Sequence, residues 1–170
     1  KEVSILNRVV RWGEDCLWYE ADPRHVEKLL KDAGMEGCKY LGTPGVKDPF
    51  TAASTAWFEK EPSGERGLLL PKSGDDENRP LDREEMRKYR SVVARCNYLA
   101  ADRFEIAFTT KELCRAMANP TMADARAIKR LCKFLAGLPR VVQKIPFLDF
   151  PPTVIKTYVD SDWAGCRQSR

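Results

Sequence analysis

The chain has 170 residues, of which 43% are hydrophobic and 32% are charged, and its formal net charge is +4. This composition is ordinary for a globular protein and argues against long disorder, and no apolar run approaches the ~20 residues that a membrane-spanning helix needs. The first residues lack the apolar core and cleavage site of a signal peptide, and because no initiator Met is present we expect a piece of a longer chain.

Residues 1–41 predict a β-hairpin followed by a helix. Apolar residues in "VSILNRVV" indicate one strand, "GED" a tight turn and "CLWYEA" a second strand. Asp22 followed by Pro23 is a strong signal for a helix start, and Gly34 for its end.

Residues 42–80 differ in composition from their flanks. Pro and Gly recur throughout, and "SGDDENRP" contains no apolar residue, so we interpret this stretch as a linker or long loop. Within it, "AASTAWFEK" forms a short helical turn or docks Trp57 and Phe58 on the rest of the protein, and both alternatives stay open.

Residues 81–140 predict three helices. Asp82 is expected to cap the first, Asp102 the second, and Thr121 with Asp124 in the capping-box position the third. Each helix has an apolar stripe at helical spacing. The stripes are Met86, Tyr89, Val93, Cys96 and Ala100; Ile106, Thr110, Leu113 and Met117, with Phe104 and Phe108 beside them; and Ala125, Ile128, Leu131, Cys132 and Leu135.

Residues 141–170 predict strands at "RVVQKIPF" and "TVIKTYVDSD". The expected fold class is therefore α+β, with an N-terminal hairpin plus helix, a long linker, a three-helix module and C-terminal strands. The predicted domain boundaries are 1–41, 42–80, 81–140 and 141–170.

The six cysteines form no C-x-x-C pair, and three of them fall on apolar helix stripes. We interpret them as reduced thiols, which favours an intracellular compartment, although the sequence does not specify which one. The single histidine, His25, has no second His or Cys pair nearby, so a surface residue is a better interpretation than a zinc ligand.

The basic charge is concentrated in the predicted helical module. Residues 81–140 contain 13 Lys and Arg against 7 Asp and Glu, a balance of +6. On the third helix four cations follow the spacing i, i+3, i+4 and i+7, which places them on one face: Arg126, Lys129, Arg130 and Lys133. Such a face can contact consecutive phosphates of a nucleic acid, although an ordinary solvated helix face is the alternative.

Many short motifs in consistent order resemble the Pol polyprotein of copia-type LTR retrotransposons. They are Tyr89-Arg90, Tyr98-Leu99, Asp102-Arg103, Ile106-Ala107-Phe108, Asn119-Pro120, Lys129-Arg130, Phe134-Leu135, Gly137 and Asp160 through Gly165. More loosely, "SILNRVVRW" is similar to a strand after the polymerase palm, and "YEADPRHVEKLLKDAGMEGCKYLGTPG" to a segment ending in "TPG". The resemblance implies a region from the end of the reverse transcriptase palm, through thumb and connection, to the first strand of ribonuclease H.

The resemblance also implies roles for particular residues. Asp160 matches the first catalytic, metal-binding carboxylate of ribonuclease H, which with further acids holds two Mg²⁺ ions. One strand cannot supply that cluster, and the polymerase's Tyr-x-Asp-Asp loop has no counterpart here, so no cofactor is expected in this chain alone. The same reasoning disfavours a free-standing nuclease using Asp160 and Asp162.

Two functions remain open from the sequence. The first is a non-catalytic portion of a reverse transcriptase–ribonuclease H that contacts an RNA–DNA hybrid or duplex. The second is a co-opted retroelement piece that binds protein partners in a larger assembly, using apolar linker groups such as Trp57, Phe58 and Leu68 to Leu70. Departures from the family pattern, such as Phe104 in "RFE" and Cys166 after "DWAG", motivate the second.

Overall fold

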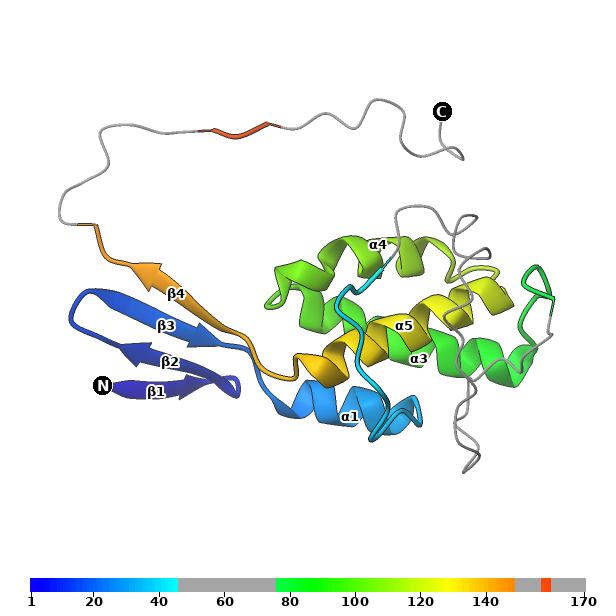
Figure 1. Ribbon diagram of the computed structural model, residues 1–170, viewed down its shortest axis with the longest axis horizontal. Coiled ribbons are helices and arrows are strands. Elements are labelled where there is room, and N and C mark those ends of the chain that lie inside the picture. Colours follow the sequence, from blue (N-terminus) through cyan, green and yellow to red (C-terminus); the bar gives the residue numbers. More distant parts are fainter. Residues whose placement is uncertain (46–75, 149–156, 160–170) are drawn as a thin grey trace.

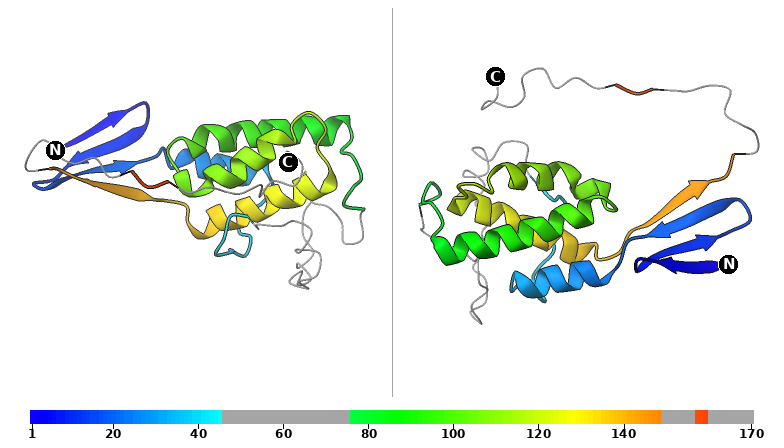
Figure 2. Two further views of the ribbon diagram at one scale, coloured as in Figure 1. Left: turned by 90° about the horizontal axis from the view of Figure 1, so that it is seen from above. Right: turned by 180° about the vertical axis from the view of Figure 1, so that it is seen from behind.

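The structure is a computed structural model that describes residues 1–45, 76–148 and 157–159. Its elements confirm the α+β class. In chain order they are β1 (Glu2–Ile5), β2 (Arg8–Trp12), β3 (Cys16–Glu20), α1 (Arg24–Asp32), α3 (Arg83–Ala100), the 3₁₀ helix η1 (Phe104–Ile106), α4 (Ala107–Arg115), α5 (Met122–Gly137) and β4 (Val142–Pro146). The sheet extends from one end of the group of helices (Figures 1 and 2).

The N-terminal segment contains one strand more than predicted. The stretch expected to be a single strand is the hairpin β1–β2, which is closed by a two-residue turn at Leu6 and Asn7. Both turn residues have positive φ, 51° and 64°, as a type I′ hairpin turn requires. Asn adopts this conformation readily but Leu rarely does, so the apolar run concealed the turn.

The strand at residues 142–146 was predicted correctly, but its neighbour was not. β4 pairs antiparallel with β3, from Cys16 opposite Pro146 to Glu20 opposite Val142, and completes a sheet of order β1-β2-β3-β4. Within the described residues it therefore belongs to the N-terminal sheet rather than to a separate C-terminal one. The second predicted C-terminal strand lies mostly outside the described residues, and residues 157–159 are not in a strand.

The predicted ends of α1 are confirmed. A carboxylate oxygen of Asp22 accepts a hydrogen bond from the amide of Arg24 at 3.0 Å. At the other end Gly34 has φ 64°, its amide donates to the carbonyl of Lys31, and the amide of Met35 donates to that of Leu30. These two bonds form a Schellman motif, which satisfies carbonyls that the helix leaves unpaired.

The predicted caps of α3 and α5 are also present. Asp82 accepts from the amide of Glu85 while the side chain of Glu85 accepts from the amide of Asp82, both at 2.8 Å. At α5 the carboxylate of Asp124 accepts from both the amide and the hydroxyl of Thr121. The reciprocal bonds at α3 satisfy one of the first free amides of that helix, that of Glu85, and therefore define where it begins.

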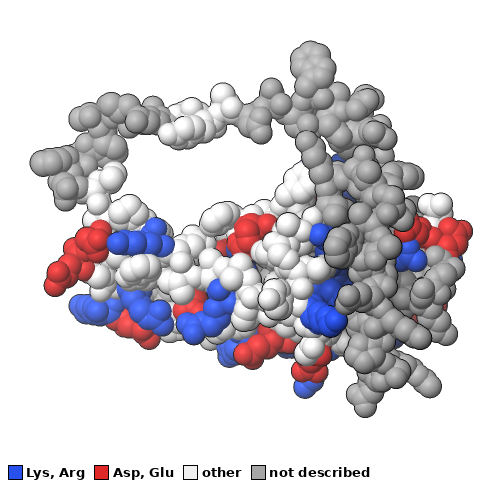
Figure 3. Space-filling model, in the orientation of Figure 1, with Lys and Arg blue, Asp and Glu red and all other residues white. Residues whose placement is uncertain are grey.

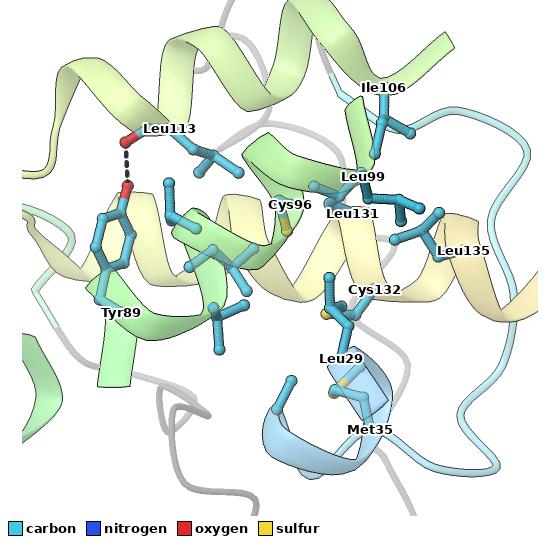
Figure 4. Packing of buried hydrophobic residues seen from close by; sticks show 14 of the residues in the cluster. Leu29, Met35, Tyr89, Cys96, Leu99, Ile106, Leu113, Leu131, Cys132 and Leu135 are labelled. Atoms are coloured by element: carbon cyan, nitrogen blue, oxygen red, sulfur yellow. Dashed lines mark hydrogen bonds between the residues drawn. The ribbon is translucent and has the colours of Figure 1, made fainter. Parts of the chain in front are cut away.

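The hydrophobic core lies between α1, α3, α4 and α5 and contains the predicted stripes (Figure 4). The hydroxyl of Tyr89 donates to the carbonyl of Leu113 at 2.8 Å, which removes the cost of burying it. Phe104 and Phe108, predicted beside the second stripe, are instead 70% and 62% exposed.

Asp102 does not cap a helix, contrary to the prediction, but joins the sheet to the helices. Its buried carboxylate accepts from the Nε of Arg8 at 2.9 Å and from the hydroxyl of Tyr19, which lie on β2 and β3. The Nε2 of Gln143 on β4 donates to the Asp102 carbonyl at 2.7 Å. Three strands thus bind one residue just beyond α3, and burial together with the Asp102 bond raises the pKa of Tyr19.

Two further buried charges support this junction. Arg103, whose side chain is 2% exposed, donates to the carbonyl of Leu138 at 2.9 Å and pairs with Glu105. Glu20, 3% exposed, accepts two bonds from Arg140, at 2.6 and 2.9 Å. Leu138 and Arg140 lie in the short segment between α5 and β4. The bonds from Arg103 and to Glu20 therefore hold that segment in place.

We predict that Asp102→Ala lowers the free energy of unfolding by about 2–3 kcal/mol, because it removes a buried carboxylate that binds both Arg8 and the hydroxyl of Tyr19. Asp32→Ala is the matched control, because it also removes an Arg–Asp pair. Asp32 lies 2.7 Å from Arg95, and the side chain of Asp32 is 37% exposed. The control should cost under about 1 kcal/mol. Urea unfolding measures both, and equal losses would contradict the assigned role.

We also predict that Glu20 makes stability depend on pH. The hydrogen bond from Arg140 lowers the pKa of Glu20 below its usual 4.5, so its stabilising contribution is complete above that value and is lost as the pH falls through the folded-state pKa. Glu20→Gln should therefore cost about 1–2 kcal/mol at about pH 7 and progressively less towards about pH 3. Urea unfolding at several pH values measures this difference. A loss of unfolding free energy in Glu20→Gln that does not change with pH would exclude this role.

Candidate nucleic-acid interface

The four predicted cations lie on one side of α5, opposite its buried stripe. The spacing of Arg126, Lys129, Arg130 and Lys133 along a regular helix produces this arrangement, and all four side chains are half-buried. Their aliphatic stems therefore lie against neighbouring groups, which restricts where each charged end can be.

Residues 40–43, which follow α1, run alongside α5. The amide of Leu41 donates to the carbonyl of Lys133 at 3.3 Å, and Arg130 donates to the hydroxyl of Thr43 at 2.6 Å. Tyr40 lies against Gly137, where an added Cβ would come within 2.6 Å of the Tyr40 Cβ, so no larger residue fits without a shift. Figure 1 shows this cyan segment crossing α5.

Residues 76–81 hold the other end of α5. Glu77 forms an ion pair with Arg126, and its carbonyl accepts from the amide of Ala123 at 3.1 Å. The carbonyl of Arg79 accepts from the amide of Met122 at 3.0 Å. Both flanks of the predicted linker are therefore bound to α5, and they bring an acid and a hydroxyl to the basic face.

This arrangement is suited to binding an anion rather than to acid–base chemistry. Lysine and arginine are donors at neutral pH, and the only carboxylate placed on this face among the described residues is that of Glu77. The Nε of Arg130 is buried without a hydrogen-bond partner in the described part of the chain. On the face that Figure 3 shows, acidic and basic residues are interspersed.

The predicted metal ligand Asp160 lies outside the described residues. Within the ranges that are described, no three His, Cys, Asp or Glu side chains are grouped as a metal site requires. His25 is half-buried, 3.8 Å from the Asp22 carboxylate and in tilted contact with the ring of Tyr98.

The cysteines of the described ranges are free thiols, as predicted, at Cys16, Cys38, Cys96, Cys114 and Cys132. Burial raises the pKa of Cys96 to about 12 and also raises the pKa of Cys132. Both thiols therefore stay protonated at neutral pH and act as small hydrophobic groups of the core.

Comparison with known proteins shows a distant similarity to retrotransposon sequences. The chain is 26% identical over 147 residues to the "Uncharacterized mitochondrial protein AtMg00810" of Arabidopsis thaliana, a match that covers 86% of the chain and 50% of that protein. It is 35% and 34% identical over 79 residues to the retrovirus-related Pol polyproteins from transposons RE1 and RE2 of the same plant.

The two Pol matches cover 46% of the chain but 5% of each polyprotein, so the chain spans about half of one relative and a small part of the others. No family model and no solved structure matches the chain. The predicted relation to retrotransposon Pol polyproteins is thus supported by sequence similarity, without establishing which region of Pol it represents. Among the described helices, none is long and apolar enough to cross a membrane.

The sequence pattern identified the cations of α5 but not the groups that contact them. Tyr40, Thr43 and Glu77 come from stretches without helix or strand periodicity, and no local signal links them to α5. Their contacts depend on how the chain returns to α5, which only the fold specifies.

We predict that the core thiols are protected from reagents in the folded protein. Cys96→Ala and Cys132→Ala should each leave the number of thiols that react with Ellman's reagent unchanged under native conditions, because both side chains are fully buried. In about 6 M guanidinium each variant should show one reactive thiol fewer than the parent chain. A loss of one fast-reacting thiol in the native state would contradict this packing.

Proposed function

We propose that this chain is a non-catalytic portion of a retrotransposon reverse transcriptase–ribonuclease H and contacts the phosphate backbone of its nucleic acid through α5. The observation that carries the proposal is the set of four cations on one side of that helix, each partly immobilised by packing: Arg126, Lys129, Arg130 and Lys133. The similarity to Pol polyproteins supports a nucleic-acid ligand.

Phosphate binding of this kind is electrostatic and independent of base sequence. Each phosphate that a Lys or Arg neutralises releases a condensed counterion, which makes affinity fall steeply with salt. Packing of the aliphatic stems reduces the conformational entropy that each side chain would lose on binding. A phosphate could replace Glu77 as the partner of Arg126, because that carboxylate is about half exposed.

The finer assignments extend the same proposal. Residues 1–41 correspond to the end of the polymerase palm and the thumb, and residues 81–140 to the thumb and connection. The residues after β4 begin a ribonuclease H domain, in which Asp160 is the first of the Mg²⁺ ligands of the complete enzyme. The chain would work inside a cell. None of the described residues supplies catalysis in this scheme, so the chain positions a duplex for active sites that other parts provide.

A second candidate function is that of a co-opted, non-enzymatic subunit that binds protein partners. The apolar groups first predicted for that role, Trp57, Phe58 and Leu68 to Leu70, lie outside the described residues. A different observation favours it, since apolar side chains on the sheet are exposed, among them Ile5 at 53% and Trp12 at 43%.

Nucleic-acid contact is tested by fluorescence anisotropy with an RNA–DNA hybrid of about 20 base pairs over a range of KCl concentrations. We expect Lys129→Gln combined with Lys133→Gln to weaken binding about tenfold at low salt and to reduce the slope of log affinity against log salt by about 2. Loss of two phosphate contacts has both effects together.

The matched control is Lys28→Gln combined with Lys31→Gln, which removes two exposed lysines of α1 and the same net charge. It should leave the salt slope almost unchanged. Equal effects of the two double variants would show that net charge alone drives binding, and no salt-dependent binding by the parent chain would exclude the proposal.

A further inference from the structure

The strand register divides the sheet into two unlike faces, because directly paired residues point to the same side. One side, called the apolar face below, carries Val3, Ile5, Arg8, Val10, Trp12, Leu17, Tyr19, Gln143 and Ile145. The other side, called the charged face, carries Glu2, Arg11, Glu20 and Lys144 among Ser4, Val9, Cys16, Trp18, Val142 and Pro146. Arg11 binds Glu2 at 2.5 Å, and Arg140 binds Glu20 at 2.6 Å.

The helices cover the apolar face only at its inner end. There Arg8, Tyr19 and Gln143 bind Asp102, as described above. Farther out no described helix lies over the sheet, which Figures 1 and 2 show extending away from α1 and α3.

The β1 edge and the outer end of the apolar face consequently expose large apolar side chains. Their exposed fractions are 41% for Val3, 53% for Ile5, 43% for Trp12 and 48% for Ile145. Phe147 is two positions beyond Ile145, has its amide bonded to the carbonyl of Asp15 at 2.8 Å, and is 46% exposed, so it extends the same alternation. The solvated face of an antiparallel sheet is normally polar, whereas here much of the apolar face is left open as well.

We propose that a second copy of this chain covers the apolar face, so that two sheets pack face to face around a two-fold axis. Five side chains of this size, each about half exposed, contribute on the order of 400 Å², which is roughly half of the ~800 Å² per partner of a standard interface. The apolar part of an interface has about this share.

The charges of the sheet favour this occupant. Of the charged residues in the strands, the register places Arg8 alone on the apolar face, and Asp102 already neutralises it; Lys1 lies at the corner beside Trp12. A nucleic acid or an acidic protein would find no available cation at the centre of this face. Its complement is another uncharged apolar sheet surface, and a two-fold axis brings the identical face of a second copy into that position.

The test is the mass of the full chain in solution, measured by sedimentation velocity from about 1 to 200 µM. We expect the weight-average mass to rise from one chain to two over this range. Val3→Lys and Ile145→Lys, made separately on the edge strands β1 and β4, should each keep the far-ultraviolet spectrum and weaken dimerisation at least tenfold, because each would bury a lysine among the apolar side chains of the interface.

The matched control is Val142→Lys, which replaces a valine that is also 41% exposed and on an edge strand, but on the charged face opposite Glu20. It should leave dimerisation unchanged. A parent chain that stays monomeric at the highest concentration overturns the proposal, whether or not another protein or segment covers the face. A dimer that tolerates Val3→Lys and Ile145→Lys overturns it equally, because the contact would then lie elsewhere.

Discussion

The interaction on which the rest of the structure depends is the buried carboxylate of Asp102. It accepts bonds from Arg8 on β2 and Tyr19 on β3, while its own carbonyl accepts from Gln143 on β4. Burying a carboxylate costs free energy unless its oxygens accept hydrogen bonds. The Asp102 carboxylate is hydrogen-bonded by the strands only while the sheet is packed against the helices. This shared site explains how a largely solvated sheet stays attached to the core at one end.

The same junction determines where α5 presents its cations. Arg103, adjacent to Asp102, donates to carbonyls at the end of α5, and the chain leaves that helix directly into β4. Because β4 is hydrogen-bonded to β3, the sheet holds the C-terminal end of α5 while Glu77 and Arg79 hold its start. The side of α5 that carries Arg126 and Lys133 therefore has a defined orientation relative to the sheet.

Features that depend on residues close together in the chain could mostly be predicted from the sequence. Helix caps and core stripes could be predicted because they depend on residues three or four positions apart, as Asp82 with Glu85 and Leu131 with Leu135 illustrate. The turn at Leu6 could not, since a leucine with positive φ contradicts its own preference.

Contacts between residues far apart in the chain correspond to no local pattern in the sequence. Asp102 has every local feature of a helix cap, but Arg8 and Tyr19, more than eighty positions earlier, bind the carboxylate instead. Pairing of β4 with β3 and the contact of Thr43 with Arg130 likewise join distant segments. At the candidate site the sequence thus predicted which cations share a face, but not the neighbours that partly cover them.

The central claim is that the sheet and the helices form one folding unit through Asp102. Native-state hydrogen exchange tests it most directly, because it measures the opening free energy of each amide. We expect the amides of Val10 and Tyr19 in the central strands to exchange with the same free energy as core amides of α3 and α5, within about 0.5 kcal/mol. Exchange of the strand amides through a separate opening of much lower free energy, while α3 stays protected, would contradict the account.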